Sequence, residues 1–205
     1  MKRLSVGGVL FLGLALLLAA CGQLTPAGVG GEEIVIGVIA PLTGEIPKVG
    51  ESTQNAAQMA VDEINEAGGL EIGGVQHNVR IIIEDNESRA ESSVAAATKL
   101  ITQDNVIAII GPQASKQAVP TGQVANDRET PMISPWSTNP DATFNRPWVF
   151  RAAFLDPFQG TVMASFVQEE FGAQTAAVLY DIASDYPNGL AENFRSAFEE
   201  AGGEI

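Results

Sequence analysis

IVIGVI, residues 34–39, is an uninterrupted apolar run made largely of β-branched side chains. Such a run is typical of a strand buried on both faces of a parallel sheet, since no position is left polar to face water. Residues 52–67 follow with the period of an amphipathic helix, and Gly68-Gly69 then stops it. This period places on one face Ala56, Met59, Ala60, Ile64 and Ala67. A buried strand and an amphipathic helix in this order predict one βα unit.

The same alternation continues along the chain. We expect further strands over residues 79–83, 106–110, 132–134, 148–153 and 176–180. We expect helices over residues 90–103, 115–127, 158–171 and 188–201, with a tight turn or short hairpin at 72–77 and a long Pro-rich loop at 135–147. Strands that alternate with helices imply right-handed crossovers. The predicted fold class is therefore α/β, with doubly wound parallel sheets.

Composition excludes several classes of protein. The chain has 205 residues, 45% of them apolar, and a formal net charge of −14 from 11 Lys and Arg against 25 Asp and Glu. The apolar content predicts a packed core. The charge makes nucleic acid an unsuitable partner, because the field of the whole protein repels phosphates. The single Cys excludes an internal disulfide and a multi-cysteine metal site.

The N-terminus has the pattern of an export signal. Lys2 and Arg3 precede an apolar run over residues 6–20, which is short of the roughly 20 residues needed to span a bilayer. The run ends at Leu18-Ala19-Ala20-Cys21, which resembles the lipobox of bacterial lipoproteins, so we expect Cys21 to be acylated. Residues 1–20 are then a signal peptide and residues 21–33 a flexible tether. The mature protein is expected outside the cytoplasmic membrane, either lipid-anchored at its outer face or in the periplasm.

Motifs for enzymatic chemistry are missing from the sequence. Neither of the two glycine-rich phosphate-binding motifs, G-x-x-x-x-G-K-S/T and G-x-G-x-x-G, follows a predicted strand, and there is no G-x-S-x-G nucleophile elbow. The lone His77 lies in a turn-like segment, and Asp85-Asn86-Glu87 lacks the Gly and Glu that a calcium loop needs. We therefore expect no cofactor, no metal and no catalysis.

Small hydroxyl side chains follow two of the predicted strands. Ser115 opens the helix after the strand at 106–110, while Ser134, Ser137 and Thr138 follow the strand at 132–134. Ligands of open α/β sheets bind outside the carboxyl ends of the strands. Because the start of a helix carries partial positive charge, Ser115 is a candidate to hold a carboxylate. It is equally a candidate helix cap, and the two roles are compatible.

Five groups of residues resemble, in order and spacing, the first lobe of type I periplasmic binding proteins. They are Ile36-Gly37-Val38 with Pro41-Leu42-Thr43-Gly44; residues 60–65 with Gly68-Gly69; Ile109-Ile110-Gly111 with Ser115; Pro131-Met132-Ile133-Ser134 with Thr138; and Phe150-Arg151 with Asp156 and Gln159-Gly160. The resemblance is strongest to the leucine/isoleucine/valine-binding receptors of ABC importers. It implies two α/β lobes that close on a small ligand about a hinge.

That resemblance also implies an organisation of the chain. Residues 34–152 are expected to form the N-terminal part of lobe 1, and residues 153–205 to begin lobe 2. Because the chain ends just inside a further predicted strand, we expect an N-terminal fragment of a receptor. Its partners would be an amino acid or related small amide, an ABC permease, and the membrane through the N-terminal lipid.

The ligand-binding residues implied by the resemblance lie on both lobes. They are Ser115 for the ligand carboxylate, Trp136 for a backbone contact, Thr138 for the α-amino acid head group with Ser137 beside it, and Tyr186 over the ligand. Tyr186 is equally a candidate to pack on its own lobe. The sequence departs from the family at Val49, where a Tyr is frequent, and at Trp136, where a small residue is usual. The acidic partner of the ligand ammonium is expected beyond Ile205.

Two other functional classes stay open from the sequence. A ligand sensor of the same fold could pass its signal to a partner other than a permease. An exported enzyme would need a nucleophile, base or metal site, which we cannot assemble from these residues.

Overall fold

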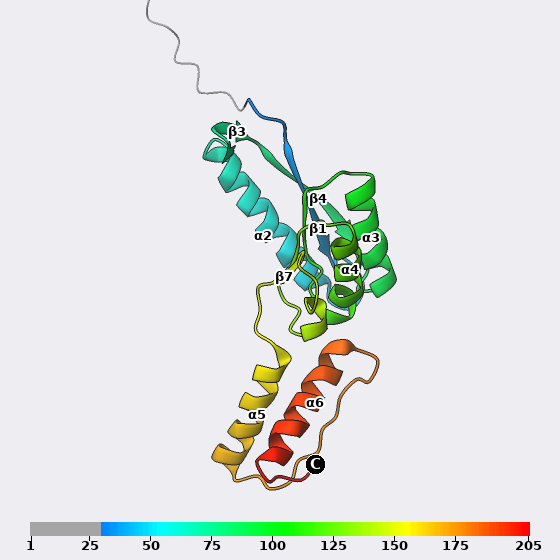
Figure 1. The fold of residues 1–205 in the computed structure, drawn as a ribbon, viewed down its shortest axis with the longest axis vertical. Helices are drawn as coiled ribbons and strands as arrows, with labels where there is room; N and C mark the ends of the chain where they lie inside the picture. Colours follow the sequence, from blue (N-terminus) through cyan, green and yellow to red (C-terminus); the bar gives the residue numbers. More distant parts are fainter. Residues whose placement is uncertain (1–29) are drawn as a thin grey trace, which may run out of the picture.

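The computed structural model describes residues 30–205, and its centre is a five-stranded parallel sheet (Figure 1). The strand order is β4-β1-β5-β6-β7, so the chain leaves β1 for one edge and then returns to build the other. This reversal makes the sheet doubly wound, which confirms the predicted fold class. The strands are β1 (Ile34–Ala40), β4 (Val79–Asp85), β5 (Ala108–Ile110), β6 (Met132–Ser134) and β7 (Val149–Arg151).

Helices cover both faces of the sheet. Figure 1 shows α2 (Pro47–Glu66) on one side, and α3 (Ala90–Thr102) with α4 (Ser115–Asp127) on the other. Alternate residues of β1 supply the two cores, because successive side chains of a strand point to opposite faces. Ile39 packs in the cluster of α3 and α4, and Ile34 packs against Val61 of α2. The two-sided burial predicted for residues 34–39 is thus confirmed.

Helix α2 departs from the sequence prediction in its start and in its buried face. It begins at Pro47 rather than at residue 52, since a proline in the first turn lacks only a donor that the helix leaves unused. Gly50 lies inside the helix, where any Cβ would collide with the Pro41 carbonyl. The predicted apolar face is largely wrong: Val61 is buried and Met59 is 60% exposed, although Ile64 of the predicted face does pack against the core.

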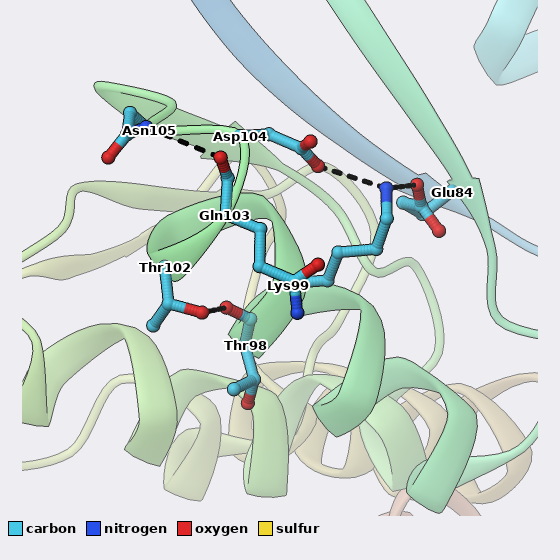
Figure 2. A network of polar contacts seen from close by, with 7 residues as sticks. All are labelled: Glu84, Thr98, Lys99, Thr102, Gln103, Asp104 and Asn105. Carbon is cyan, nitrogen blue, oxygen red and sulfur yellow. Dashed lines mark hydrogen bonds and ion pairs between the residues drawn. The ribbon is translucent and has the colours of Figure 1, made fainter.

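An ion-pair network fastens the end of α3 to the sheet (Figure 2). Lys99 Nζ donates to Glu84 Oε1 at 2.6 Å and to Asp104 Oδ2 at 3.0 Å. Glu84 belongs to β4, and Asp104 to the turn that leads into β5. These hydrogen bonds raise the pKa of Lys99 above its ordinary value. The network links the end of α3 to strand β4 and to the turn before β5.

The remaining chain forms a hairpin and a pair of helices. Strands β2 (Leu70–Ile72) and β3 (Val75–His77) pair as the short hairpin predicted there. Helices α5 (Asp156–Phe171) and α6 (Asp185–Glu200) lie side by side beyond the end of the sheet (Figure 1). They begin at Asp156 and Asp185, slightly earlier than predicted.

The strand predicted at residues 176–180 is not formed. A single parallel bridge joins Thr175 to Glu204, and Leu179 is fully exposed. A strand exists only where a neighbouring backbone pairs with it, and Glu204 offers that pairing at one point. Local β-propensity alone was therefore a poor guide to this segment.

Candidate functional site

A cleft of about 590 Å³ opens at the carboxyl ends of the five parallel strands. This is the place where open α/β sheets bind ligands. Its other wall is α6 with the segment that precedes it. The loops after the five strands contribute Glu45 after β1, Ser88 after β4, Gln113–Gln117 after β5, Pro135, Trp136 and Thr138 after β6, and Ala152–Phe154 after β7, while the far wall contributes Asp181, Ser184, Tyr186 and Pro187.

The turn after β5 needs its glycine to reach this cleft. Gly111 has a φ of +96°, and a Cβ there would collide with the Ile39 carbonyl of β1. Only glycine combines that conformation with so close an approach. Ser134 then fixes the path, because its hydroxyl donates to the Pro112 carbonyl at 2.6 Å and accepts from Ser137 N at 3.2 Å. Ser134 is thus a link between two loops, and it does not line the cleft.

Ser115 is the first residue of α4, and its hydroxyl is held by two neighbours rather than by its own helix. The helix cap is Ala114, and no side chain caps it, so the expected capping role of Ser115 is wrong. Ser115 Oγ lies 2.9 Å from Ser137 Oγ and accepts from Asn139 N at 3.4 Å. When the Ser137 hydroxyl donates to Ser115, the Ser115 proton is free to donate into the cleft. The geometry suits recognition of an anion at this point.

Four of the five predicted ligand-binding residues line the cleft together. Ser115, Trp136 and Thr138 approach from the sheet, and Tyr186 approaches from α6, where its hydroxyl accepts from Gln159 Nε2 at 3.3 Å. Ser137 lies behind them, 1% exposed, with its hydroxyl on Ser115. The structure thus places Ser137 as a support for Ser115 and outside the lining.

Two buried glutamine side chains in the cleft wall were not singled out from the sequence. Gln113 and Gln117 are each 2% exposed, and neither Oε1 atom has a hydrogen-bond partner among residues 30–205. A buried amide oxygen without a donor is costly, so each oxygen suits a ligand that brings an N–H group. Their nearness in sequence to Ser115 was the signal that could have pointed to them.

Charged side chains also reach the cleft from both walls. Lys116 Nζ pairs with Glu45 Oε2 at 2.8 Å, joining the start of α4 to the loop after β1. Asp181 lies on the opposite wall, where its Oδ1 accepts from Ala183 N at 2.9 Å. Asp181 comes directly after residues 176–180, which were predicted as a strand, and the end of such a strand is where a ligand contact would have been expected.

A polar cluster joins the sheet to the helix pair behind the cleft. Arg151 donates to the carbonyls of Ser137 and Asn139, at 3.1 and 2.8 Å, and so fixes the loop that carries Thr138. Asn139 Nδ2 in turn donates to the Asp185 carbonyl at 2.9 Å. The neighbouring Asp156 is fully buried, and burial raises the pKa of its carboxyl above the ordinary value, although Thr138 and Arg151 partly oppose this shift.

The described residues contain no group of three or more His, Cys, Asp and Glu side chains placed to hold a metal ion. His77 lies in β3, where its Nδ1 is 2.8 Å from the Glu32 carbonyl, away from the cleft. Across residues 30–205, no helix has the length and apolar character to cross a bilayer. The predicted signal peptide, Cys21 and most of the tether lie outside the described residues.

A family model described as periplasmic binding protein matches residues 33–205. The chain belongs to this family. The Leu/Ile/Val-binding protein BraC3 of Rhizobium johnstonii is 33% identical over 171 residues, which are 83% of this chain and 45% of that protein. The chain therefore spans about half the length of the curated relatives that it matches.

Two solved structures of this family share the same fold. One is a leucine-binding protein LivK from Thermotoga maritima, with a TM-score of 0.76 and 34% identity over 84% of this chain and 47% of that chain. The other is the branched-chain amino acid transporter substrate-binding protein LivJ from Streptococcus pneumoniae in complex with isoleucine. Its TM-score is 0.75 at 34% identity, over 84% of this chain and 48% of that chain. The resemblance inferred from the sequence is confirmed at the level of family and fold.

Proposed function

We propose that this periplasmic binding protein chain belongs to the substrate-binding protein of an ABC importer and captures an amino acid. The observation that carries the proposal is the cleft at the carboxyl ends of the strands, with the hydroxyl of Ser115 on one wall and Tyr186 on the other. The relatives named for leucine, isoleucine and valine support an amino acid as the ligand class.

In this proposal the ligand carboxylate binds at the start of α4. The hydroxyl of Ser115 and the first N–H groups of the helix donate to it, because the helix start carries partial positive charge. Thr138 and the backbone at Trp136 orient the α-amino acid head group from the loop after β6. Tyr186 covers the ligand from the second wall, and no step of the process needs a covalent change.

We further propose that residues 34–152 belong to lobe 1 and residues 153–205 to lobe 2. The boundary lies between β7 and α5, in the short segment that leaves the sheet. Asn139 bonds across this boundary to the Asp185 carbonyl, and Arg151 holds the Asn139 carbonyl from the lobe 1 side, so Asn139 is placed to act where the lobes hinge. Closure of the lobes would then bring Tyr186 onto a ligand held by Ser115.

We propose that the mature protein is anchored by lipid at Cys21 and delivers its ligand to a permease. Labelled palmitate should enter the wild-type chain and be lost in Cys21→Ser, with the protein released from the membrane fraction. Retention of the Cys21→Ser protein in the membrane would contradict the anchor. Uptake of labelled amino acid by cells with and without the gene separates transport from ligand sensing.

Binding itself is tested by thermal unfolding in the presence of single L-amino acids. A ligand that binds only the native state raises the free energy of unfolding, by about 2.7 kcal/mol when its concentration is 100 times Kd. The melting temperature rises accordingly. L-Leucine and L-phenylalanine should stabilise the protein and be recovered unchanged. Chemical conversion of the ligand would show an enzyme instead, and no stabilisation by any L-amino acid would overturn the proposal.

A further inference from the structure

Three aromatic side chains converge on the cleft from three separate elements. Trp136 follows β6, Phe154 lies in the connection from β7 to α5, and Tyr186 is in the first turn of α6. Their exposed fractions are 53%, 58% and 37%, so much of each ring faces the cleft or solvent. Trp136 and Phe154 therefore offer ring surface on the sheet side, opposite Tyr186.

Neighbouring side chains hold two of these rings. Phe154 meets Phe158 edge to face, with ring centroids 6.3 Å apart and an interplanar angle of 62°. The hydroxyl of Tyr186 is bonded by Gln159, which also lines the cleft. Rings that are already oriented lose less conformational freedom when a ligand covers them.

Exposed aromatic surface favours a ligand that covers it with a flat apolar group. Each aromatic side chain can bury roughly 150–250 Å², and ring pairs in edge-to-face or offset geometry gain beyond the buried area. A branched aliphatic side chain gains the free energy of burying apolar surface, but it lacks the additional attraction between aromatic rings. From the size of that attraction, an aromatic ligand should bind about three- to tenfold more tightly than an aliphatic one.

The charges and orphan oxygens of the cleft favour an ammonium group on the same ligand. Lys116 is already paired with Glu45, which leaves the carboxylate of Asp181 as the unbalanced charge in the lining. The buried amide oxygens of Gln113 and Gln117 accept no hydrogen bond within the described part of the chain, so they suit N–H donors. An aromatic acid without an amino group would leave both glutamine oxygens without a donor and the charge of Asp181 unbalanced.

We propose that the cleft selects an amino acid with an aromatic side chain over one with a branched aliphatic side chain. This inference rests on the proposed function, because it assumes that the carboxylate end is held at Ser115. Trp136 and Phe154 are its specificity-determining residues. The amino group is recognised by Asp181 from the far wall and by the two glutamines from the wall after β5.

Isothermal titration calorimetry with the purified chain tests the selection. L-Phenylalanine should bind about three- to tenfold more tightly than L-leucine, and 4-hydroxybenzoate more weakly than either amino acid. Trp136→Ala and Phe154→Ala should each move the phenylalanine-to-leucine ratio toward one. Phe144→Ala is the matched control, because its ring is 68% exposed and lies outside the cleft lining; it should leave the ratio unchanged.

The contrary outcomes separate this inference from the proposed function. Tighter binding of leucine, or a ratio unmoved by Trp136→Ala and Phe154→Ala, would overturn aromatic selection and leave an amino acid receptor. Tighter binding of 4-hydroxybenzoate would overturn the assignment of the ammonium site. Failure of both amino acids to bind would overturn the proposed function and the inference together.

Discussion

Replacing Ser115 by Ala tests the anion site most directly. The substitution removes the hydroxyl that can donate to a ligand carboxylate when Ser137 donates to Ser115. A hydrogen bond to a charged group is worth roughly 1.5–3 kcal/mol, which corresponds to a Kd weakened roughly 10- to 150-fold. Titration calorimetry with L-leucine and L-phenylalanine measures this change for both ligands.

The same substitution also has a cost for the unliganded fold. It leaves Ser137 Oγ, which is 2.9 Å from Ser115 Oγ, without a partner in a buried position. The bond from Asn139 N is longer, 3.4 Å, and contributes less. We therefore expect a stability loss of about 1–2 kcal/mol, measured by denaturant unfolding without ligand.

Ser137→Ala is the matched control for this experiment. It removes the same hydroxyl pair, so its loss of stability should be similar, but Ser137 does not line the cleft. Its Kd should change by less than about fivefold, as expected from the loss of a supporting hydrogen bond. Equal weakening of binding in both variants, or unchanged binding in Ser115→Ala, would refute a direct contact between Ser115 and the ligand.

Three further predictions concern stability. Asp85 accepts hydrogen bonds from Leu42, Thr43 and Glu87. Burial raises the pKa of its carboxyl, but these hydrogen bonds together lower it further, so the net pKa is below the ordinary value. Asp85→Ala should therefore cost about 1–2 kcal/mol of stability at pH 7. This difference should vanish as the pH falls from about 4 through the lowered pKa, and a difference independent of pH in thermal melts would contradict it. Burial raises the pKa of the Asp156 carboxyl, so its negative charge opposes folding as the pH rises. Asp156→Asn should therefore raise the melting temperature at pH 7 and have no such effect near pH 4. A lower melting temperature of the variant at pH 7 would show that the charge is needed. A Cβ on Gly160 would lie 2.7 Å from both Asn193 Cβ and Phe194 N, so Gly160→Val should cost about 1–3 kcal/mol in denaturant unfolding by forcing α5 from α6, and an unchanged midpoint would be the contrary result.

The elements around the five-stranded sheet followed from local patterns. The run at 34–39, the hairpin glycines and the helix at residues 115–127 were predictable because periodicity and turn residues act within a few positions of one another. The buried side of α2 was not predictable in this way. Its choice of Val61 over Met59 depends on where β1 and β4 lie, which no local period contains.

The site was partly predictable for a related reason. Ser115, Trp136 and Thr138 follow strands, and the carboxyl ends of parallel strands meet at one edge. Phe154 and Asp181 also follow predicted strands, at 148–153 and 176–180, but only the structure shows that both line the cleft, although residues 176–180 form no strand. Sequence alone also could not separate Ser115 as a ligand contact from Ser115 as a helix cap.

The sequence by itself determined the fold class, the family and the edge of the sheet where the cleft opens, since each depends on the order and spacing of residues along the chain. Only the tertiary structure decided that Ser137 supports Ser115 from behind, and that three aromatic rings from separate elements share one cleft with Asp181. These relations join residues 22 to 71 positions apart, as in the Ser115–Ser137 and Glu45–Lys116 contacts. Contacts between residues so far apart in the sequence are set by the packing of whole helices and strands, which the local pattern of side chains does not predict.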